Sequence, residues 1–462
     1  MPESLQFDRR MSDAEGLMWR LEKDPHLSST YANITVLDRR PDFDRLKRRM
    51  ERAVHMVPRL RQRVQPTPAN LSAPLWVDDP NFDIDYHVRH LALPKPGSMR
   101  QLLDLTTLIA VDPFDRTRPL WQFTVVDGLP KGRSALVQKL HHTITDGEGG
   151  VRLSLEFLDF DRDAPELPPL DAETIAALAD PAPAAGSSDV FKDLFSGSLK
   201  LPLGMLRQVR ELLADPTGIH TAGASAADAV RGIVSQLSDV DRARSPLWTD
   251  RSLKRRLDTL RTPFSETRAA AKRLGGTLNT AFVTAAAHAS ADYHTRLGSP
   301  VEQLRTSMAI STRTSSSGSN AFSLARMLVP TAEMPIAERF ALINEAATTA
   351  RESSGAASLD SLASLAASLP TSVITRLARQ QAQTIDFATS NVRAAPIPLY
   401  VAGSQILENY PVGPLAGTAF NLTLMSYDGS LDMGLNVDTA AVTEPDLLRD
   451  ALVRAFEELI RS

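Results

Sequence analysis

The chain has 462 residues, of which 43% are hydrophobic and 23% are charged, and its formal net charge at pH 7 is −4. This composition is typical of a folded globular protein, the length predicts two domains of roughly 150–230 residues each, and the acidic balance argues against binding nucleic acid. The sequence contains no cysteine, which excludes disulfides, thiolate metal sites and a cysteine nucleophile.

The chain begins Met1-Pro2-Glu3-Ser4-Leu5-Gln6 and lacks the apolar run of a secretory signal there. No segment reaches the roughly 18 consecutive apolar residues that a membrane-spanning helix needs. We therefore expect a protein that is soluble or lies on a membrane surface.

Residues 42–57 are expected to form an amphipathic helix that ends before Pro58. Its apolar side carries Leu46, Met50, Val54 and Val57, and its other side carries Arg45, Lys47, Arg48, Arg49 and Arg52. The basic side is either a docking surface for phosphate groups or anionic lipid, or a solvated helix face, and the second is the commoner outcome.

Three alternating segments follow. Residues 82–88, 121–126 and 134–140 are predicted to be strands, and the Gly/Pro-containing turn at 127–132 predicts a hairpin between the last two. A helix is expected to open after Gly150.

The composition changes at residue 161, where prolines, alanines and acidic residues indicate a linker. Short helices are expected within or after it, at 190–213 and 224–237. A second domain is expected to begin near Leu247-Trp248.

In this second half the patterns predict helices at 264–274, 278–297, 337–351, 357–383 and 445–460, a serine-rich loop at 311–319, and strands at 420–427 and 431–437. Strands and helices mixed in both halves predict an α/β layered architecture.

The residues with the clearest chemical meaning are Leu140-His141-His142-Thr143-Ile144-Thr145-Asp146-Gly147, where a strand is expected to end and a helix to begin. Adjacent side chains near a strand end point to opposite sides, so only one histidine can face a given cleft. Asp146 is placed to orient an imidazole or to anchor the loop, and Gly147 suits a sharp turn.

An imidazole is well suited to remove a proton from an alcohol that attacks a carbonyl group. No G-x-S-x-G nucleophile motif is present, so direct transfer from an activated donor is favoured over an acyl-enzyme. Two alternatives remain at this level: a purely structural histidine pair, and a metal site, for which His87 and His90 are the only other close pair and which we do not expect.

The histidine run resembles the HHxxxDG motif of the CoA-dependent acyltransferase superfamily, which includes chloramphenicol acetyltransferase-like enzymes and peptide-synthetase condensation domains. Two segments before the histidines resemble the bacterial wax ester synthase/diacylglycerol acyltransferase family. They are Asp112-Pro113-Phe114-Asp115-Arg116-Thr117-Arg118-Pro119-Leu120-Trp121 and Asp127-Gly128-Leu129. Later segments at 256–279, 390–403 and 421–429 resemble that family in the same order. The likeness therefore covers nearly the whole chain.

The resemblance implies a two-domain chloramphenicol acetyltransferase-like α/β fold with a channel between the domains. The expected parts are an acyltransferase domain at 1–160 with the motif, a linker at 161–245 and a second acyltransferase domain at 246–462. His142 would act as the base, His141 would be supportive or buried, and Asp146 would hold the loop beside Gly147. Further family positions with a channel or structural role are Pro119, Leu120, Trp121, Asn279 and Asn391.

The resemblance also implies transfer of a long-chain acyl group from acyl-CoA to diacylglycerol or a fatty alcohol, without a cofactor or metal. Such a protein would be cytoplasmic and bound peripherally to the inner membrane or to lipid droplets. Two departures matter: the family's Asn-Asp pair is Asn279-Thr280, and its Pro-Gly-Pro is replaced after Asn391-Val392 by residues 393–396. The alternatives are an acyltransferase for another lipid hydroxyl, and a weakly active paralogue that serves as a lipid-binding scaffold.

Overall fold

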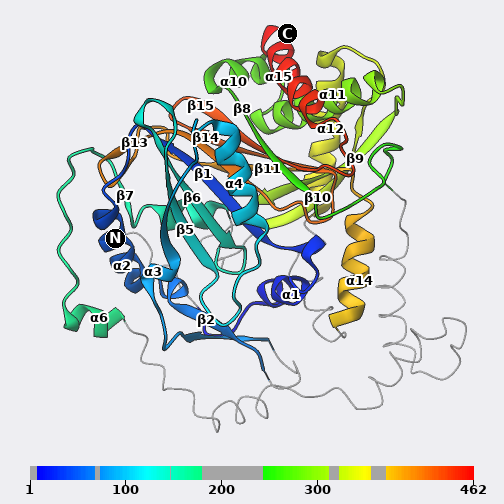
Figure 1. Cartoon of the computed structure of the whole chain (residues 1–462). Coiled ribbons are helices and arrows are strands. Elements are labelled where there is room, and N and C mark those ends of the chain that lie inside the picture. The colour runs from blue at the N-terminus through cyan, green and yellow to red at the C-terminus, as the bar shows by residue number, and fades with distance from the viewer. Residues whose placement is uncertain (1–7, 68–72, 146, 179–242, 312–321, 355–370) are drawn as a thin grey trace, which may run out of the picture.

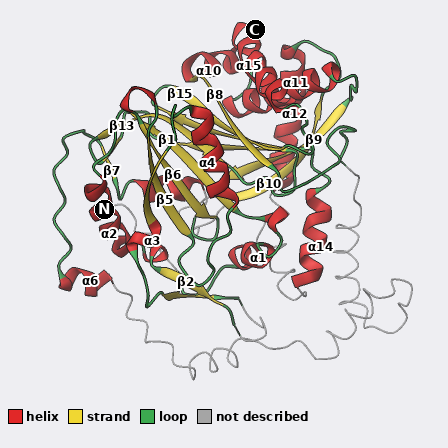
Figure 2. Ribbon diagram, viewed as in Figure 1, coloured by secondary structure: helices red, strands yellow, loops and turns green. Residues whose placement is uncertain are grey.

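A computed structural model describes residues 8–67, 73–145, 147–178, 243–311, 322–354 and 371–462. Within these residues most strands fall into a seven-stranded and a six-stranded sheet, with helices packed around them (Figures 1 and 2). A two-stranded ribbon of β2 (Gln62–Gln65) and β3 (Leu75–Asp78) lies apart from both. The mixed α/β architecture predicted from the sequence is confirmed.

The seven-stranded sheet has the order β4-β5-β6-β1-β13-β12-β7. Its strands are β1 (Thr30–Leu37), β4 (Val88–Ala92), β5 (Trp121–Asp127), β6 (Ser134–His141), β7 (Leu158–Asp159), β12 (Tyr400–Val401) and β13 (Ser404–Val412). β5 and β6 form the predicted hairpin, with Trp121 opposite Leu140 and Asp127 opposite Ser134. Every residue of β6 is buried, so this strand is the centre of the N-terminal core.

Two strands of this sheet come from the C-terminal half of the chain. β13 pairs antiparallel with β1, and β12 pairs with β7. β13 also crosses closely over β15 (Ser430–Asp438): a Cβ atom at Gly434 would lie 2.0 Å from the Pro411 carbonyl oxygen. Only glycine permits that approach. The predicted domain boundary at residue 246 therefore does not separate the two sheets, because β12 and β13 lie after it and belong to the N-terminal sheet.

The six-stranded sheet has the order β10-β9-β11-β14-β15-β8. Its other strands are β8 (Arg255–Pro263), β9 (Gln303–Ser311), β10 (Phe322–Pro330), β11 (Phe387–Arg393) and β14 (Phe420–Tyr427). Its helices are α10 (Phe264–Arg273), α11 (Leu278–Arg296), α12 (Ile336–Ser354) and α15 (Pro445–Arg461), which gather at the top of Figure 1. These four helices and the β14–β15 hairpin match their predictions. The alanines of α11 let it pack almost wholly buried within this half's core.

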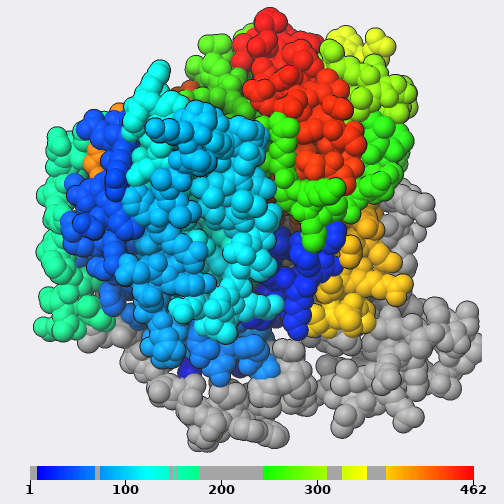
Figure 3. All heavy atoms as spheres, in the orientation of Figure 1, coloured from blue at the N-terminus to red at the C-terminus, as the bar shows by residue number. Residues whose placement is uncertain are grey.

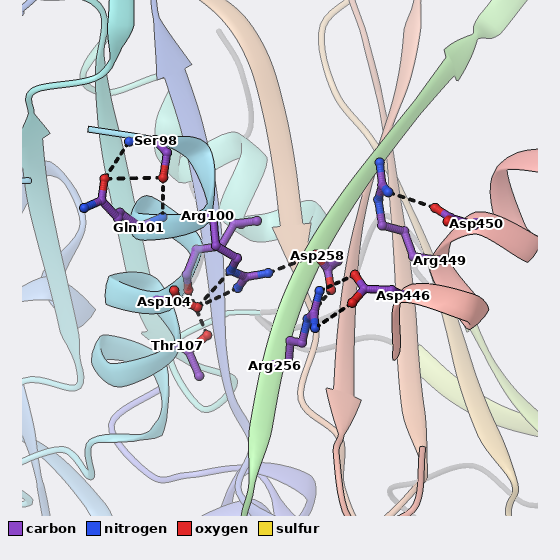
Figure 4. Close-up of polar contacts among 11 residues, drawn as sticks. Ser98, Arg100, Gln101, Asp104, Thr107, Arg256, Asp258, Asp446, Arg449 and Asp450 are labelled. Atoms are coloured by element: carbon purple, nitrogen blue, oxygen red, sulfur yellow. Dashed lines mark hydrogen bonds and ion pairs between the residues drawn. The ribbon is translucent and has the colours of Figure 1, made fainter. Parts of the chain in front are cut away.

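Helix α4 (Met99–Val111), which the sequence patterns did not predict, joins the two halves. Leu102 and Leu103 belong to one apolar cluster with residues of β1, β6 and β13 and with Leu257 of β8. Beside them Arg100 donates to Asp258 of β8 at 2.9 Å (Figure 4). Asp258 also accepts from Arg256, which pairs with Asp446 at the start of α15. An ionic chain therefore runs from α4 across the domain boundary.

Replacing Arg100 by alanine is expected to lower the free energy of unfolding by about 1 kcal/mol, because Asp258 is nearly buried and would lose one of two guanidinium partners. Guanidinium-chloride unfolding followed by tryptophan fluorescence measures this. The matched control is Arg449→Ala, which removes an exposed pair with Asp450 and is expected to change stability by less than about 0.5 kcal/mol. Equal effects of the two variants would contradict the role of the Arg100 contact.

The predicted strand at 82–88 is wrong. Residues Ile84–His87 form the short helix α3, and the strand β4 begins only at Val88. The reason is local capping and burial: the Asp83 carboxylate accepts the Asp85 backbone N–H at 3.0 Å, and the buried His87 ring stacks on Trp121 at 4.5 Å. The residues at 82–88 therefore alternate between apolar and polar although they include one turn of helix.

The predicted helix at 42–57 is confirmed as α2 (Phe43–Met56). Its basic side is engaged in local ion pairs: Arg45 and Arg49 both contact Asp159, at 2.9 and 2.7 Å, and Arg48 contacts Glu166 at 2.6 Å. These arginines hold the segment after β7 against the domain, so the docking-surface interpretation is not supported.

Several predicted segments lie outside the described residues. They are the helices at 190–213 and 224–237, nearly all of the serine-rich loop at 311–319, and the first part of the helix at 357–383. The remainder of that last helix is α14 (Thr371–Ala382). Of the linker at 161–245, residues 161–178 and 243–245 are described, including α6 (Ala172–Leu178).

Candidate active site

The two histidines lie where β6 ends between its neighbouring strands. The His141 backbone N–H donates to the Leu120 carbonyl at 3.0 Å, and the His142 N–H donates to the Ser29 carbonyl at 3.1 Å. A turn over residues 142–145 follows, and α5 (Gly147–Ser154) begins at Gly147. The motif therefore forms the strand–turn–helix connection that the sequence predicted, although Asp146 lies outside the described residues.

His141 is buried and points into the N-terminal domain. Its Nδ1 accepts the Thr143 backbone N–H at 3.1 Å, which leaves Nε2 to donate to the Glu22 carboxylate at 3.0 Å. The geometry assigns this tautomer. With both ring nitrogens engaged, His141 fixes the first turn after β6.

Glu22, just after α1 (Asp13–Leu21), collects several donors. Its carboxylate accepts from His141, from the Ser28 hydroxyl at 2.6 Å and from the Ser29 backbone N–H at 2.7 Å. Burial alone would raise the pKa of this carboxyl group, but the contacts with His141, Ser28 and Ser29 outweigh it and lower the pKa to about 2. Sequence reasoning missed Glu22, because no local pattern marks it and 119 positions separate it from His141.

His142 points to the opposite side and is only partly buried. Its ring lies against Tyr31 of β1, with the ring centroids 4.6 Å apart and the planes tilted by 40°. Gly150 of α5 makes room for this tyrosine, because a Cβ atom there would lie 3.0 Å from the Tyr31 hydroxyl oxygen. The imidazole is thus supported by packing from β1 and remains reachable from outside the core.

A polar row continues from Tyr31 along the same face of the sheet. Asn33 donates to Asn409 of β13 at 2.6 Å, and Thr35 donates to the same oxygen at 3.0 Å. Gln138 of β6 donates to Thr35 at 3.2 Å. The same face also carries Leu136 and Leu140 of β6, which pair with Thr35 and Tyr31 and belong to an apolar cluster. The side that carries His142 therefore combines an apolar surface with a row of polar groups along β1.

Replacing Tyr31 by leucine is expected to lower kcat of the reaction that the family resemblance implies about tenfold with little change in KM, because the imidazole would lose the ring that fixes its orientation. Steady-state kinetics and a thermal melt of the same preparation measure this. The Tyr31→Phe variant, which keeps the ring, is the matched control and should retain most of kcat. A fall in Tm that accounts for the whole loss would contradict a positioning role.

The segment at 112–121, which carries much of the family resemblance, forms the scaffold behind the histidines. Lys139 of β6 donates to the Asp112 carbonyl at 2.5 Å, and its Nζ lies 4.3 Å from the centre of the Phe114 ring. Burial lowers the pKa of Lys139 to about 8. Arg116 stacks on Trp19 of α1 at 3.5 Å. These contacts link β6 to α1 and hence to Glu22.

Pro119, Leu120 and Trp121 are all buried at the start of β5. The Trp121 indole N–H donates to the Leu60 carbonyl at 2.7 Å, and its own carbonyl accepts from His87. Together with the Leu120–His141 backbone bond, these contacts give the three residues a structural position under the motif.

Asn279 and Asn391 belong to the C-terminal half. Asn279 lies in the first turn of α11 and its amide contacts Met308 of β9. Its neighbour Thr280, which stands where the family has aspartate, donates to Asn344 of α12 at 3.0 Å. Asn391 lies on β11, against which α5 packs. Of these residues, Asn391 is the one that lies on the strand packed against α5, the helix that follows the two histidines.

No group of three or more metal-ligating side chains occurs among the residues that the structure describes. A buried serine–histidine pair does exist, Ser245 with His294 at 2.7 Å, but both side chains are almost fully enclosed. Ser245 also accepts backbone N–H groups from Leu247 and Trp248. This pair therefore belongs to the core of the C-terminal half.

Comparison with known proteins gives two family-model matches. Residues 11–282 match the wax ester synthase/diacylglycerol acyltransferase catalytic domain, and residues 318–460 match the WS/DGAT C-terminal domain. A putative diacylglycerol O-acyltransferase of Mycobacterium tuberculosis is 30% identical, with 99% of this chain and 93% of that protein covered. A probable diacylglycerol O-acyltransferase of the same species is 25% identical, with 96% of this chain and 94% of the relative covered.

The fold is similar to that of the wax ester synthase/diacylglycerol acyltransferase from Marinobacter aquaeolei VT8, with a TM-score of 0.67, 22% identity, and 97% and 98% of the two chains covered. The first condensation domain of the calcium-dependent antibiotic synthetase also shares it, with a TM-score of 0.59, 14% identity, and 98% and 96% covered. Together, the matched residues and the shared two-domain chloramphenicol acetyltransferase-like fold show that the chain belongs to the wax ester synthase/diacylglycerol acyltransferase family and is an acyltransferase.

Proposed function

We propose that this enzyme transfers a long-chain acyl group from acyl-CoA to the hydroxyl group of diacylglycerol, with His142 as the general base. The observation that carries the assignment is the contrast between the two histidines. His141 is enclosed and uses both ring nitrogens on Glu22 and Thr143, whereas His142 is partly exposed on the side with the polar row. Only His142 is therefore suited to meet a substrate hydroxyl.

In the proposed reaction the His142 imidazole accepts the hydroxyl proton while the alcohol oxygen attacks the thioester carbon. The carbon–oxygen bond forms, the tetrahedral intermediate collapses and the carbon–sulfur bond breaks. The imidazolium returns its proton to the CoA thiolate, so the products are an ester and free CoA. The reaction balances with the donor and the alcohol alone, and we expect it to need no cofactor.

The experiment is CoA release from palmitoyl-CoA by the purified protein, offered either diacylglycerol or a fatty alcohol. Release that depends on diacylglycerol, with triacylglycerol as the product, is the expected result. Release with the fatty alcohol alone would make the enzyme a wax ester synthase instead. No release with either acceptor from folded protein would overturn the proposal and favour another lipid hydroxyl or a lipid-binding scaffold.

The main support for the alternative, a weakly active lipid-binding scaffold, is the threonine at position 280 in place of the family's aspartate. The Thr280 hydroxyl is engaged with Asn344 and with the helix-capping Thr277, at 3.0 Å from each. This position therefore serves the packing of α11 on α12, and its substitution has a local structural explanation. It does not favour loss of the transfer reaction.

The proposed acceptor, diacylglycerol, is insoluble in water, which favours peripheral contact with a membrane or a lipid droplet. None of the described helices is long and apolar enough to cross a bilayer. α4 exposes Leu108 and Val111, 67% and 50% accessible, on one side at helical spacing. Flotation with phospholipid vesicles tests this contact, and a protein that stays in the unbound fraction with and without Leu108→Ser would overturn it.

A further inference from the structure

A cavity of about 520 Å³ opens between the two halves of the chain, beside α1 and α14. Its lining residues are Lys23, Asp24, Thr371, Ser372, Thr375, Arg376 and Arg379. The first two follow α1 and the rest belong to α14, and these helices lie next to each other, dark blue and orange, in Figures 1 and 3. The volume is within the range of about 300–1,000 Å³ that small-molecule sites occupy at domain interfaces.

The charge of this lining is strongly positive. Three cationic side chains face the single carboxylate of Asp24, which lies 3.6 Å from Arg379 and also accepts the His26 backbone N–H at 3.0 Å. Lys23 and Arg376 are exposed, and neither forms an ion pair or a hydrogen bond with any residue in the described part of the chain. Threonine and serine hydroxyls on α14 add neutral donors. Two uncompensated cations with hydroxyl groups are the chemistry that recognises phosphate esters.

The cavity also lies next to the histidine motif. Lys23 directly follows Glu22, whose carboxylate holds His141 at 3.0 Å. On the other side, α14 leads to β11, and α5 packs against that strand. The cavity is therefore connected to the motif through Glu22 on one side and through α14, β11 and α5 on the other.

We propose that this cavity binds the phosphate groups of the acyl-CoA donor. The assignment rests on the proposed function, since acyl-CoA is its donor. The arginines of α2 are paired with Asp159 and Glu166, whereas Lys23 and Arg376 have no ion-pair partner among the residues that the structure describes. The cavity is therefore the better phosphate site of the two. The pantetheine arm would extend from there towards His142.

The test compares Lys23→Glu and Arg376→Glu with Lys272→Glu, a matched reversal on the exposed surface of α10. Binding of CoA to the full-length protein is measured by calorimetry at two salt concentrations, and transfer is measured with palmitoyl-CoA and with S-palmitoyl-pantetheine, which lacks the phosphates. We expect each cavity variant to weaken CoA binding and to lower kcat/KM for palmitoyl-CoA by about tenfold. The loss with S-palmitoyl-pantetheine should be under about twofold, and the Lys272 variant should match the unmodified protein.

Three results would overturn the assignment. Unchanged CoA binding in both cavity variants would exclude phosphate recognition here, and equal losses with both donors would indicate a structural effect. Loss of binding to anionic phosphatidylglycerol vesicles without any change for CoA would assign the cavity to lipid headgroups. Failure of the proposed function looks different: CoA binding would depend on Arg376 while no alcohol accepts the acyl group.

Discussion

Replacing His142 by alanine is expected to lower the rate of acyl transfer by about 10²–10⁴-fold while the protein stays folded, because loss of a general base typically has an effect of this size. The side chain lies at the end of β6, partly exposed and in contact with Tyr31, so its removal opens no fully enclosed cavity. The measurement is CoA release from palmitoyl-CoA with the preferred acceptor, together with a thermal melt.

The control for this experiment is another exposed histidine. His90 lies on β4 and pairs with Asp127 at 2.6 Å, and His90→Ala should retain most of the rate. The His142→Ala variant should still bind CoA with the affinity of the unmodified protein, since its role is in chemistry and not in donor binding. A folded His142→Ala protein that keeps most of its activity would remove this residue from the mechanism.

The position of His142 at the end of a strand was predictable because the signal is local. A strand pattern, two histidines and a Gly-containing turn stand within a few residues of each other, and the structure has the same strand–turn–helix order. What the sequence could not provide is the partner of the first histidine. Glu22 belongs to a different element, and its approach to His141 depends on how α1 packs against β6 through the 112–121 segment.

The fold shows the same division between local and long-range information. Hairpins β5–β6 and β14–β15 follow from alternation around a turn, α15 follows from helical spacing, and α11 follows from its many alanines. The pairing of β13 with β1 joins residues more than 370 positions apart, and no periodicity encodes it. Helix α4 does carry a local signal at its start, because Ser98 and Gln101 form a capping box.

Glu22→Gln is expected to destabilise the protein by roughly 2–3 kcal/mol at neutral pH and to reduce activity as well. The amide keeps the shape of the side chain but not its charge. Its NH₂ group would face either the Ser29 backbone N–H and the His141 ring N–H, or the Ser28 hydroxyl, which would have to rotate from donating to accepting. The turn that carries His142 would then lose its support from α1. Denaturant unfolding at pH 7 measures the loss. Glu457→Gln on the exposed side of α15 is the control and should change stability by less than about 0.5 kcal/mol.

The pH dependence separates the effect of the Glu22 charge from simple packing. The pKa of Glu22 is about 2 in the folded protein, against an ordinary value of 4.5. A carboxyl group with a lowered pKa contributes its full stabilisation above its unfolded pKa, and this contribution disappears as the pH falls from about 4.5 towards 2. The stability difference between the unmodified protein and Glu22→Gln should therefore be constant from pH 7 to about pH 5 and shrink progressively below it. A difference that stays constant down to pH 3 would mean that the carboxylate is not what holds His141, and that the variant merely disturbs the packing around it.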